Sequence, residues 1–106
     1  MTEAEQLGFR ALADPTRRSI LRLLAKDEMT IAEVAENFQM TRAAVKKHLA
    51  VLSEGDLIRV ETVGRTRRNS FNPDGLRRVF DWFGYFDVFW DDRLSALKSE
   101  IEKDVQ

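Results

Sequence analysis

Two short helical patterns follow each other in the segment TIAEVAENFQMTRAAVKKHLAVLSEGDLI, which runs from Thr30 to Ile58. The first opens with Thr30 and has Glu33 three residues later, which is the spacing of a capping box. The second opens with Thr41 as a candidate N-cap and repeats apolar residues at helical spacing, at Val45, Leu49 and Leu52. Two helices joined by a turn of three or four residues predict a helix-turn-helix over about residues 30–54.

The second of these helices, over about residues 42–54, has two unlike faces. One face is apolar and suited to anchoring the helix on the body of the protein. The other carries small or basic residues, namely Arg42, Ala43, Lys46, Lys47 and Ala50. Arg and Lys donate to guanine acceptors in the major groove, and Ala fits against a thymine methyl. We therefore predict a recognition helix that reads bases through Arg42, Ala43, Lys46 and Lys47; the alternative is a merely solvated helix face.

Two helices are predicted before this motif. The segment TEAEQLGFRALAD contains Leu7 and has acidic residues in its first turn, as helix starts favour. A second helix begins after Asp14, a candidate N-cap, with Pro15 at its first position. One continuous helix is disfavoured because Pro15 opposes helical geometry at Asp14.

A β-hairpin is predicted over about residues 57–72. The segment LIRVETV alternates apolar and polar residues, GRTR supplies a turn, and RNSFN returns as the partner strand. Gly55, before the hairpin, is expected to end the preceding helix in the left-handed conformation. The hairpin would be a wing that contacts the DNA backbone or the minor groove through Arg65, Arg67 and Arg68, unless these arginines only solvate a loop tip. Thr30 and Thr41, at helix N-termini, are candidate phosphate contacts, although capping explains them equally well.

One long C-terminal helix is predicted over about residues 74–103. It holds seven aromatic residues within eleven positions: Phe80, Trp82, Phe83, Tyr85, Phe86, Phe89 and Trp90. A single helix face has no room for all of them, so part of this surface must meet another body. We predict a dimer interface between this helix and the first helix, built by Leu7, Phe83, Phe86, Trp90, Leu94, Leu97 and Ile101. An internal core or a pocket for an apolar effector is the alternative.

Composition narrows the class of protein. A chain of 106 residues is the size of one domain, and its net charge of −1 hides a basic segment. Residues 41–78 carry nine Lys or Arg against four Asp or Glu, which leaves eight against fourteen elsewhere. The chain contains no cysteine and no apolar run of membrane-spanning length, so we expect a cytoplasmic protein. The single histidine, His48, has no convincing nucleophile, base or metal partner, and we expect neither an enzyme nor a metal or cofactor site.

The order of these elements resembles that of the ArsR/SmtB family of bacterial transcriptional repressors. The resemblance rests on ALADPTRRSILRLL (11–24), the helix-turn-helix segment (30–58) and GRTRRNSFNPDGL (64–76). It implies a mainly α winged helix-turn-helix with one small β-hairpin, and a homodimer that blocks transcription by binding double-stranded operator DNA. Many members sense metals through cysteines or through His and carboxylate clusters, and this sequence has no such motif; its effector is unknown. The competing function is a winged-helix module that binds another protein instead of DNA.

Overall fold

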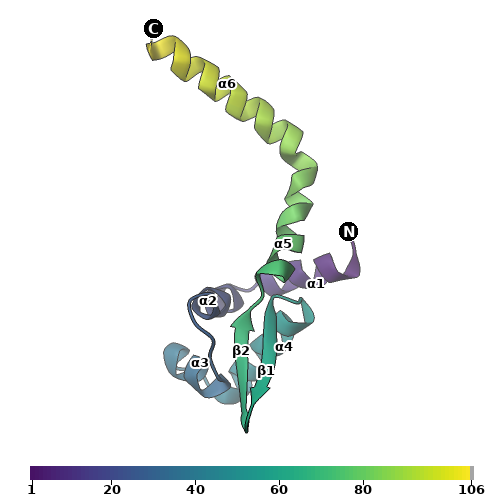
Figure 1. The fold of residues 1–106 in the computed structure, drawn as a ribbon, viewed down its shortest axis with the longest axis vertical. Coiled ribbons are helices and arrows are strands. Elements are labelled where there is room, and N and C mark those ends of the chain that lie inside the picture. The colour runs from purple at the N-terminus through teal and green to yellow at the C-terminus, as the bar shows by residue number, and fades with distance from the viewer. Residues whose placement is uncertain (106) are drawn as a thin grey trace.

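The computed structural model describes the backbone of residues 1–105 and the side chains of residues 1–90, 93 and 96–101. The first two helices, α1 (Glu3–Leu12) and α2 (Pro15–Leu24), are joined by a tight connection (Figure 1). The Asp14 carboxylate accepts the backbone N–H of Arg17 at 3.0 Å, and Pro15 occupies the first turn of α2. The predicted break between the two helices is confirmed.

The helix-turn-helix consists of α3 (Ile31–Phe38) and α4 (Arg42–Glu54). Thr30 and Glu33 form the predicted capping box at the start of α3, each side chain accepting the backbone N–H of the other. Gln39 ends α3 in the left-handed conformation, with φ of 53°. Thr41 then caps α4 by accepting the backbone N–H of Ala44 at 3.1 Å.

The expectation that Gly55 ends α4 in the left-handed conformation is wrong. Gly55 has φ of −79°, and the next residue, Asp56, has the positive φ of 58°. The reason for glycine at this position is packing: a Cβ on Gly55 would lie 2.9 Å from the carbonyl oxygen of Leu7 in α1. Gly55 therefore allows the end of α4 to approach α1, and Asp56 takes the left-handed conformation that Asp tolerates.

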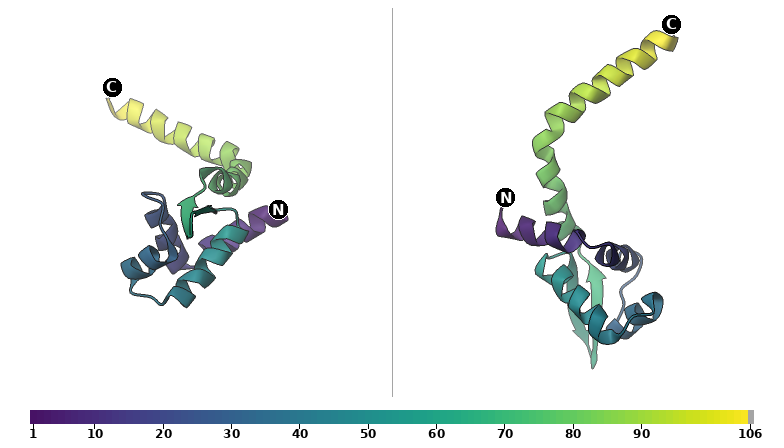
Figure 2. Two further views of the ribbon diagram at one scale, coloured as in Figure 1. Left: turned by 60° about the horizontal axis from the view of Figure 1, so that its bottom comes forward. Right: turned by 180° about the vertical axis from the view of Figure 1, so that it is seen from behind.

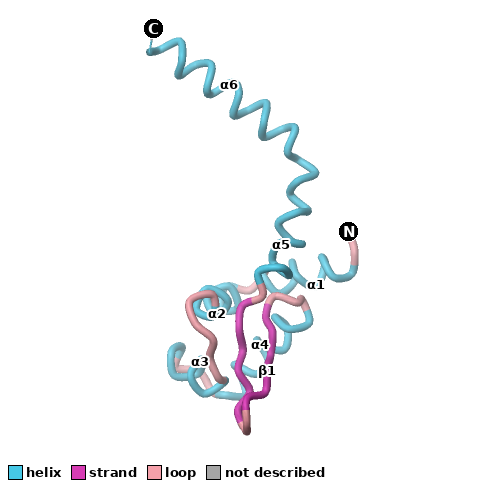
Figure 3. Tube along the Cα trace, in the orientation of Figure 1, coloured by secondary structure: helices cyan, strands magenta, loops and turns pink. Residues whose placement is uncertain are grey.

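The wing is an antiparallel hairpin of β1 (Ile58–Val63) and β2 (Thr66–Phe71). Val63 pairs with Thr66, so only Gly64 and Arg65 form the turn, and Gly64 has φ of 63°. Figure 3 shows the two strands, in magenta, as a narrow hairpin that projects beside α3 and α4. The loop before α3 forms an isolated antiparallel β-bridge with β2, because the backbone groups of Met29 and Asn69 exchange hydrogen bonds of 2.9 and 2.8 Å.

The C-terminal region predicted as one helix over 74–103 is divided into three pieces. These are α5 (Pro73–Trp82), the 3₁₀ turn η1 (Phe83–Phe86) and α6 (Asp87–Val105). One local and one tertiary cause explain the break: Gly84 is a poor helix former, and the rings of Trp82 and Phe83 lie edge-on to Phe9 of α1, at 5.5 and 6.0 Å. Figures 1 and 2 show α6 bending at η1 and extending away from the other elements, which gives the chain extents of 64 × 32 × 23 Å.

One hydrophobic core lies between the first four helices, the hairpin and α5. Its fully buried members include Ile20 of α2, Val34 of α3, Val45 and Leu52 of α4, and Leu57, which precedes β1. Val79 brings α5 onto the same core. Within the described part of the chain, every helix is too short or too polar to cross a membrane.

Candidate nucleic-acid interface

Helix α4 presents the two faces that its sequence predicts. Val45, Leu49 and Leu52 are buried in the core. The predicted reading residues Arg42, Ala43, Lys46 and Lys47 are all exposed, as is Ala50. The helix is therefore held by one side, and its basic side is accessible along its whole length.

The start of α4 lies beside a groove of about 410 Å³ between the helix-turn-helix and the wing. Six residues predicted from the sequence line it: Thr30, Arg42, Ala43, Lys46, Arg65 and Arg67. The remaining lining residues are Ile31, Ala32 and Thr66, so four cations and no carboxylate face this space. Three elements separated in the sequence thus converge on one electropositive surface, which favours a polyanion as its ligand.

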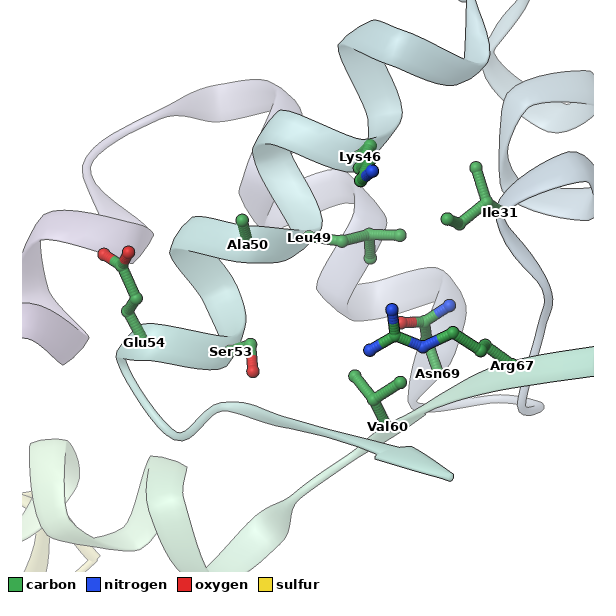
Figure 4. Close-up of a pocket in the computed structure, with 9 residues that line it drawn as sticks. All are labelled: Ile31, Lys46, Leu49, Ala50, Ser53, Glu54, Val60, Arg67 and Asn69. Atoms are coloured by element: carbon green, nitrogen blue, oxygen red, sulfur yellow. The ribbon is translucent and has the colours of Figure 1, made fainter. Parts of the chain in front are cut away.

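A second hollow, of about 310 Å³, continues from this groove along α4 towards β1 (Figure 4). Lys46 and Arg67 line both spaces, and Ile31, Leu49 and Val60 form the apolar part of the second. Figure 4 shows the Arg67 guanidinium lying beside Asn69 and Val60, in the space between the hairpin and α4. Because Lys46 and Arg67 come from opposite walls, they join the helix and wing parts of the basic surface.

Three of the predicted contact residues lie outside the groove lining: Thr41, Lys47 and Arg68. Strand alternation places Arg68 on the opposite face of β2 from Arg67. There the Arg68 guanidinium lies 3.7 Å from the Glu28 carboxylate. Lys47 is exposed on α4 and lines neither of the two hollows.

The two threonines at the helix starts serve as N-caps. Their hydroxyl oxygens accept the backbone N–H groups of Glu33 and Ala44 at 3.2 and 3.1 Å. A hydroxyl that accepts in this way keeps its own proton for donation. Capping and a hydrogen bond to a phosphate are therefore compatible at Thr30 and Thr41.

His48 contacts the N-cap of α2. Its Nδ1 lies 4.0 Å from a carboxylate oxygen of Asp14, and its side chain is largely buried between α4 and α2. The backbone N–H of Arg17 lowers the pKa of Asp14 below its ordinary value of 3.8, and the charges of Arg17 and His48 act in the same direction against partial burial. This contact places His48 of α4 beside the start of α2. Among the side chains that the structure describes, no group of three or more His, Cys, Asp or Glu residues is placed to hold a metal ion.

Sequence reasoning missed Ile31, Ala32 and Thr66 as lining residues of the basic groove. Thr66 lies within the GRTR segment predicted as the turn, so its place near the wing tip was available from the sequence, although the structure shortens the turn to Gly64 and Arg65 and begins β2 at Thr66. Ile31 and Ala32 were not identifiable, because nothing local shows that the first turn of α3 faces the start of α4 and the wing.

The residues expected at a dimer interface form a mostly exposed apolar surface in the single chain. Phe83, Phe86, Trp90, Leu97 and Ile101 are each between 40 and 55% exposed. Leu7 is half-buried, and the side chain of Leu94 lies outside the described residues. So much exposed apolar area along one connected element is typical of an interaction surface.

Comparison with known proteins agrees with this geometry. Residues 12–61 match the family described as "Helix-turn-helix domain". The chain is 34% identical over 74 residues to the transcriptional repressor SdpR of Bacillus subtilis, covering 70% of this chain and 82% of that protein. It is also 31% identical over 97 residues to an HTH-type transcriptional regulator of Mycobacterium tuberculosis, covering 92% of this chain and 88% of the relative.

Solved structures show the same architecture. An ArsR-like transcriptional regulator from a Rhodococcus species superposes with a TM-score of 0.74 at 29% identity, covering 91% of each chain. A homodimeric winged helix-turn-helix DNA-binding domain from Mycobacterium bovis, a possible ArsR-family regulator, superposes with a TM-score of 0.66 at 25% identity. That match covers 87% of this chain and 82% of the other. These relatives show that the chain belongs to the ArsR/SmtB family of winged helix-turn-helix transcriptional repressors, and the basic groove between α4 and the wing agrees with this assignment.

Proposed function

We propose that this protein is a homodimer that represses transcription by binding a specific operator and blocking its promoter. The observation that carries this proposal is the groove in which Arg42, Lys46, Arg65 and Arg67 converge without any lining carboxylate. A surface of this kind attracts the phosphate backbone and releases its counterions. The exposed face of α4 then supplies side chains for the base edges.

In the proposed complex, α4 lies in the major groove with its N-terminal half towards the bases. Arg42 and Lys46 donate to guanine acceptors, and Ala43 packs against a thymine methyl. Lys47 contributes a base or phosphate contact from the flank of the helix. Arg65 at the wing tip and Arg67 on the inner face of β2 follow the adjacent backbone or minor groove, and Thr30 and Thr41 donate to phosphates at the helix starts.

The exposed apolar surface of η1 and α6, together with Leu7 of α1, is the proposed dimer interface. A two-fold dimer presents two copies of α4, and successive major grooves on one face of B-DNA are about 34 Å apart. The operator expected for such a dimer is an inverted repeat with that spacing. Since one protomer alone offers half of the contacts, dimerisation and operator binding are coupled.

A winged-helix module that binds another protein is the second candidate, and the four cations lining one groove favour DNA over it. The test is fluorescence anisotropy of the full chain with labelled DNA from upstream of its own gene, against scrambled DNA, over a salt series. Sedimentation at micromolar concentration gives the oligomeric state. We expect a dimer that prefers the upstream fragment and loses affinity steeply as salt rises.

Two results would contradict the proposal. Absence of binding to either DNA at low salt would favour the protein-binding module. Sedimentation as a monomer at micromolar concentration would contradict the proposed dimer.

A further inference from the structure

A groove with almost wholly apolar walls lies on the side of the molecule built by α1, the end of β2 and α5. Its volume is about 390 Å³, and it is lined by Leu12, Phe71, Leu76, Val79, Phe80 and Phe83, with Arg77 as the charged member of its lining. We call it the α5 groove. Phe80 and Phe83 are 65% and 47% exposed, so the groove is open in the single chain.

A matching apolar stripe runs along η1 and α6. In the sequence, Phe83, Phe86, Trp90, Leu97 and Ile101, together with position 94, recur at intervals of three or four residues, as along the seam of a helix. Trp90, Leu97 and Ile101 are 54 or 55% exposed. We call these last three residues, with position 94, the α6 seam.

Among the side chains that the structure describes, Trp90, Leu97 and Ile101 of the α6 seam remain more than half exposed. Helix α6 packs mainly on η1, and both views in Figure 2 show it leading away from α5 and the hairpin. Its 19 residues span about 28 Å at the rise of an α-helix, enough to reach across a neighbouring body of this size. The bend at η1 therefore keeps α6 from folding back into the groove of its own chain.

We infer that, in the homodimer, the far half of each α6 seam occupies the α5 groove of the partner subunit. This inference rests on the proposed dimer and names the surface that α6 meets. Phe83 belongs both to the α5 groove and to the exposed surface of η1, so groove and interface are continuous. In a two-fold dimer the contact between the α6 seam and the α5 groove occurs twice. One arrangement therefore covers the seam and the groove of both subunits.

Apolar character favours the same occupant. Arg77, the charged residue in the groove lining, is already paired with Asp81, whose carboxylate lies 3.1 Å from its guanidinium. The contact between the groove and a second copy of α6 therefore rests on the apolar side chains of the two surfaces.

The absence of cysteine from the sequence makes thiol cross-linking a clean test in the full-length protein. One cysteine is placed in the groove, by Leu76→Cys or Phe80→Cys, and one on the seam, by Leu97→Cys or Ile101→Cys. The four double variants are treated with a short bis-maleimide and analysed by denaturing mass spectrometry. We expect at least one of them to form a covalent dimer of twice the 12.3 kDa chain mass in high yield.

Matched controls separate this arrangement from the others. The four single-cysteine variants should give at least fivefold less dimer than the best pair. The pair of Phe80→Cys with Ser99→Cys should also give little, because position 99 lies on the far side of α6 from Leu97 and Ile101.

Three outcomes would overturn the inference. Dimers from Leu97→Cys or Ile101→Cys alone would indicate that the two copies of α6 pair with each other. Links formed only within one chain would show that α6 fills the groove of its own chain. Absence of a link in every double variant would show that the α6 seam does not lie in the α5 groove. Sedimentation and DNA binding of the same variants are measured before cross-linking. A dimer that binds DNA but forms no link between the α6 seam and the α5 groove would refute this inference and leave the proposed function intact.

Discussion

Arg67 and Arg68 are adjacent in the sequence but lie on opposite faces of the wing. Arg67 lines the basic groove together with Lys46 of α4, whereas the Arg68 guanidinium lies 3.7 Å from the carboxylate of Glu28. The difference follows from the two-residue period of β2 and from its register, in which Arg67 pairs with Thr62 and Arg68 with Glu61. Two residues of the same charge and nearly the same position thus form a natural matched pair for testing the interface.

Replacing Arg67 by Ala should weaken operator binding about tenfold, which corresponds to about 1.4 kcal/mol, within the range for loss of one charged contact. The slope of log affinity against log salt should fall by about 0.9, the value for one phosphate contact. The matched Arg68→Ala change should cost less than about threefold, because it removes only an exposed ion pair worth about 0–1 kcal/mol. Fluorescence anisotropy over a salt series measures both. Equal losses in the two variants would show that the groove does not define the DNA contact.

The double change Lys46→Ala, Lys47→Ala should weaken binding and lower the salt slope, by about 0.9 for each phosphate that the lysines neutralise. Of the two single variants, Lys46→Ala should have the larger effect, since Lys46 lines both hollows beside α4. Lys26→Ala provides the control, because Lys26 is exposed near the end of α2, away from the basic groove. A double variant that binds its operator as tightly as the parent would refute the assignment of α4 as the recognition helix.

Gly75→Ala should destabilise the protein by about 1–3 kcal/mol, the usual cost of overpacking. A Cβ at this position of α5 would overlap the backbone carbonyl of Asp56, which has little freedom to move. Gly84→Ala is the comparison: its Cβ would meet only Asp87 Oδ2, at 3.6 Å, so the change should be neutral or stabilising by up to about 1 kcal/mol. Denaturant unfolding at one fixed protein concentration measures both, since the stability of a dimer depends on concentration. Equal tolerance of the two changes would contradict the close packing of α5 on Asp56.

Asp14→Asn should flatten the acid dependence of stability. Folding lowers the pKa of Asp14 below 3.8, chiefly through the backbone N–H of Arg17, so its ionised form stabilises the folded state above that pH. This stabilisation is lost as the pH falls through the lower, folded pKa. Asparagine keeps an acceptor for the Arg17 N–H but does not titrate in this range. Urea unfolding between about pH 5 and pH 2 should show a smaller decrease for Asp14→Asn than for the parent; parallel curves would contradict the role of the Asp14 carboxylate.

The starts of α2, α3 and α4 were predictable from the sequence because a cap is a local interaction. Asp14, Thr30 and Thr41 each bond to a backbone N–H three residues further on, so the residue types and their spacing contain the information. The recognition face was predictable for a similar reason, since a helix of known start assigns every later residue to a side. With Val45 and Leu49 inward, Arg42 and Lys46 had to be exposed.

The tertiary structure decided what depends on a second element. Gly55 was expected to provide the left-handed helix end, but the approach of α1 requires glycine there, and the left-handed conformation falls on Asp56. The expected C-terminal helix breaks at η1, where the rings of Trp82 and Phe83 pack on Phe9, 73 or more residues away. Likewise the meeting of Lys46 with Arg67 depends on how the hairpin folds beside α4. Helical periodicity and capping describe one segment at a time, whereas close approach, ring stacking and shared grooves arise only when distant segments are packed together.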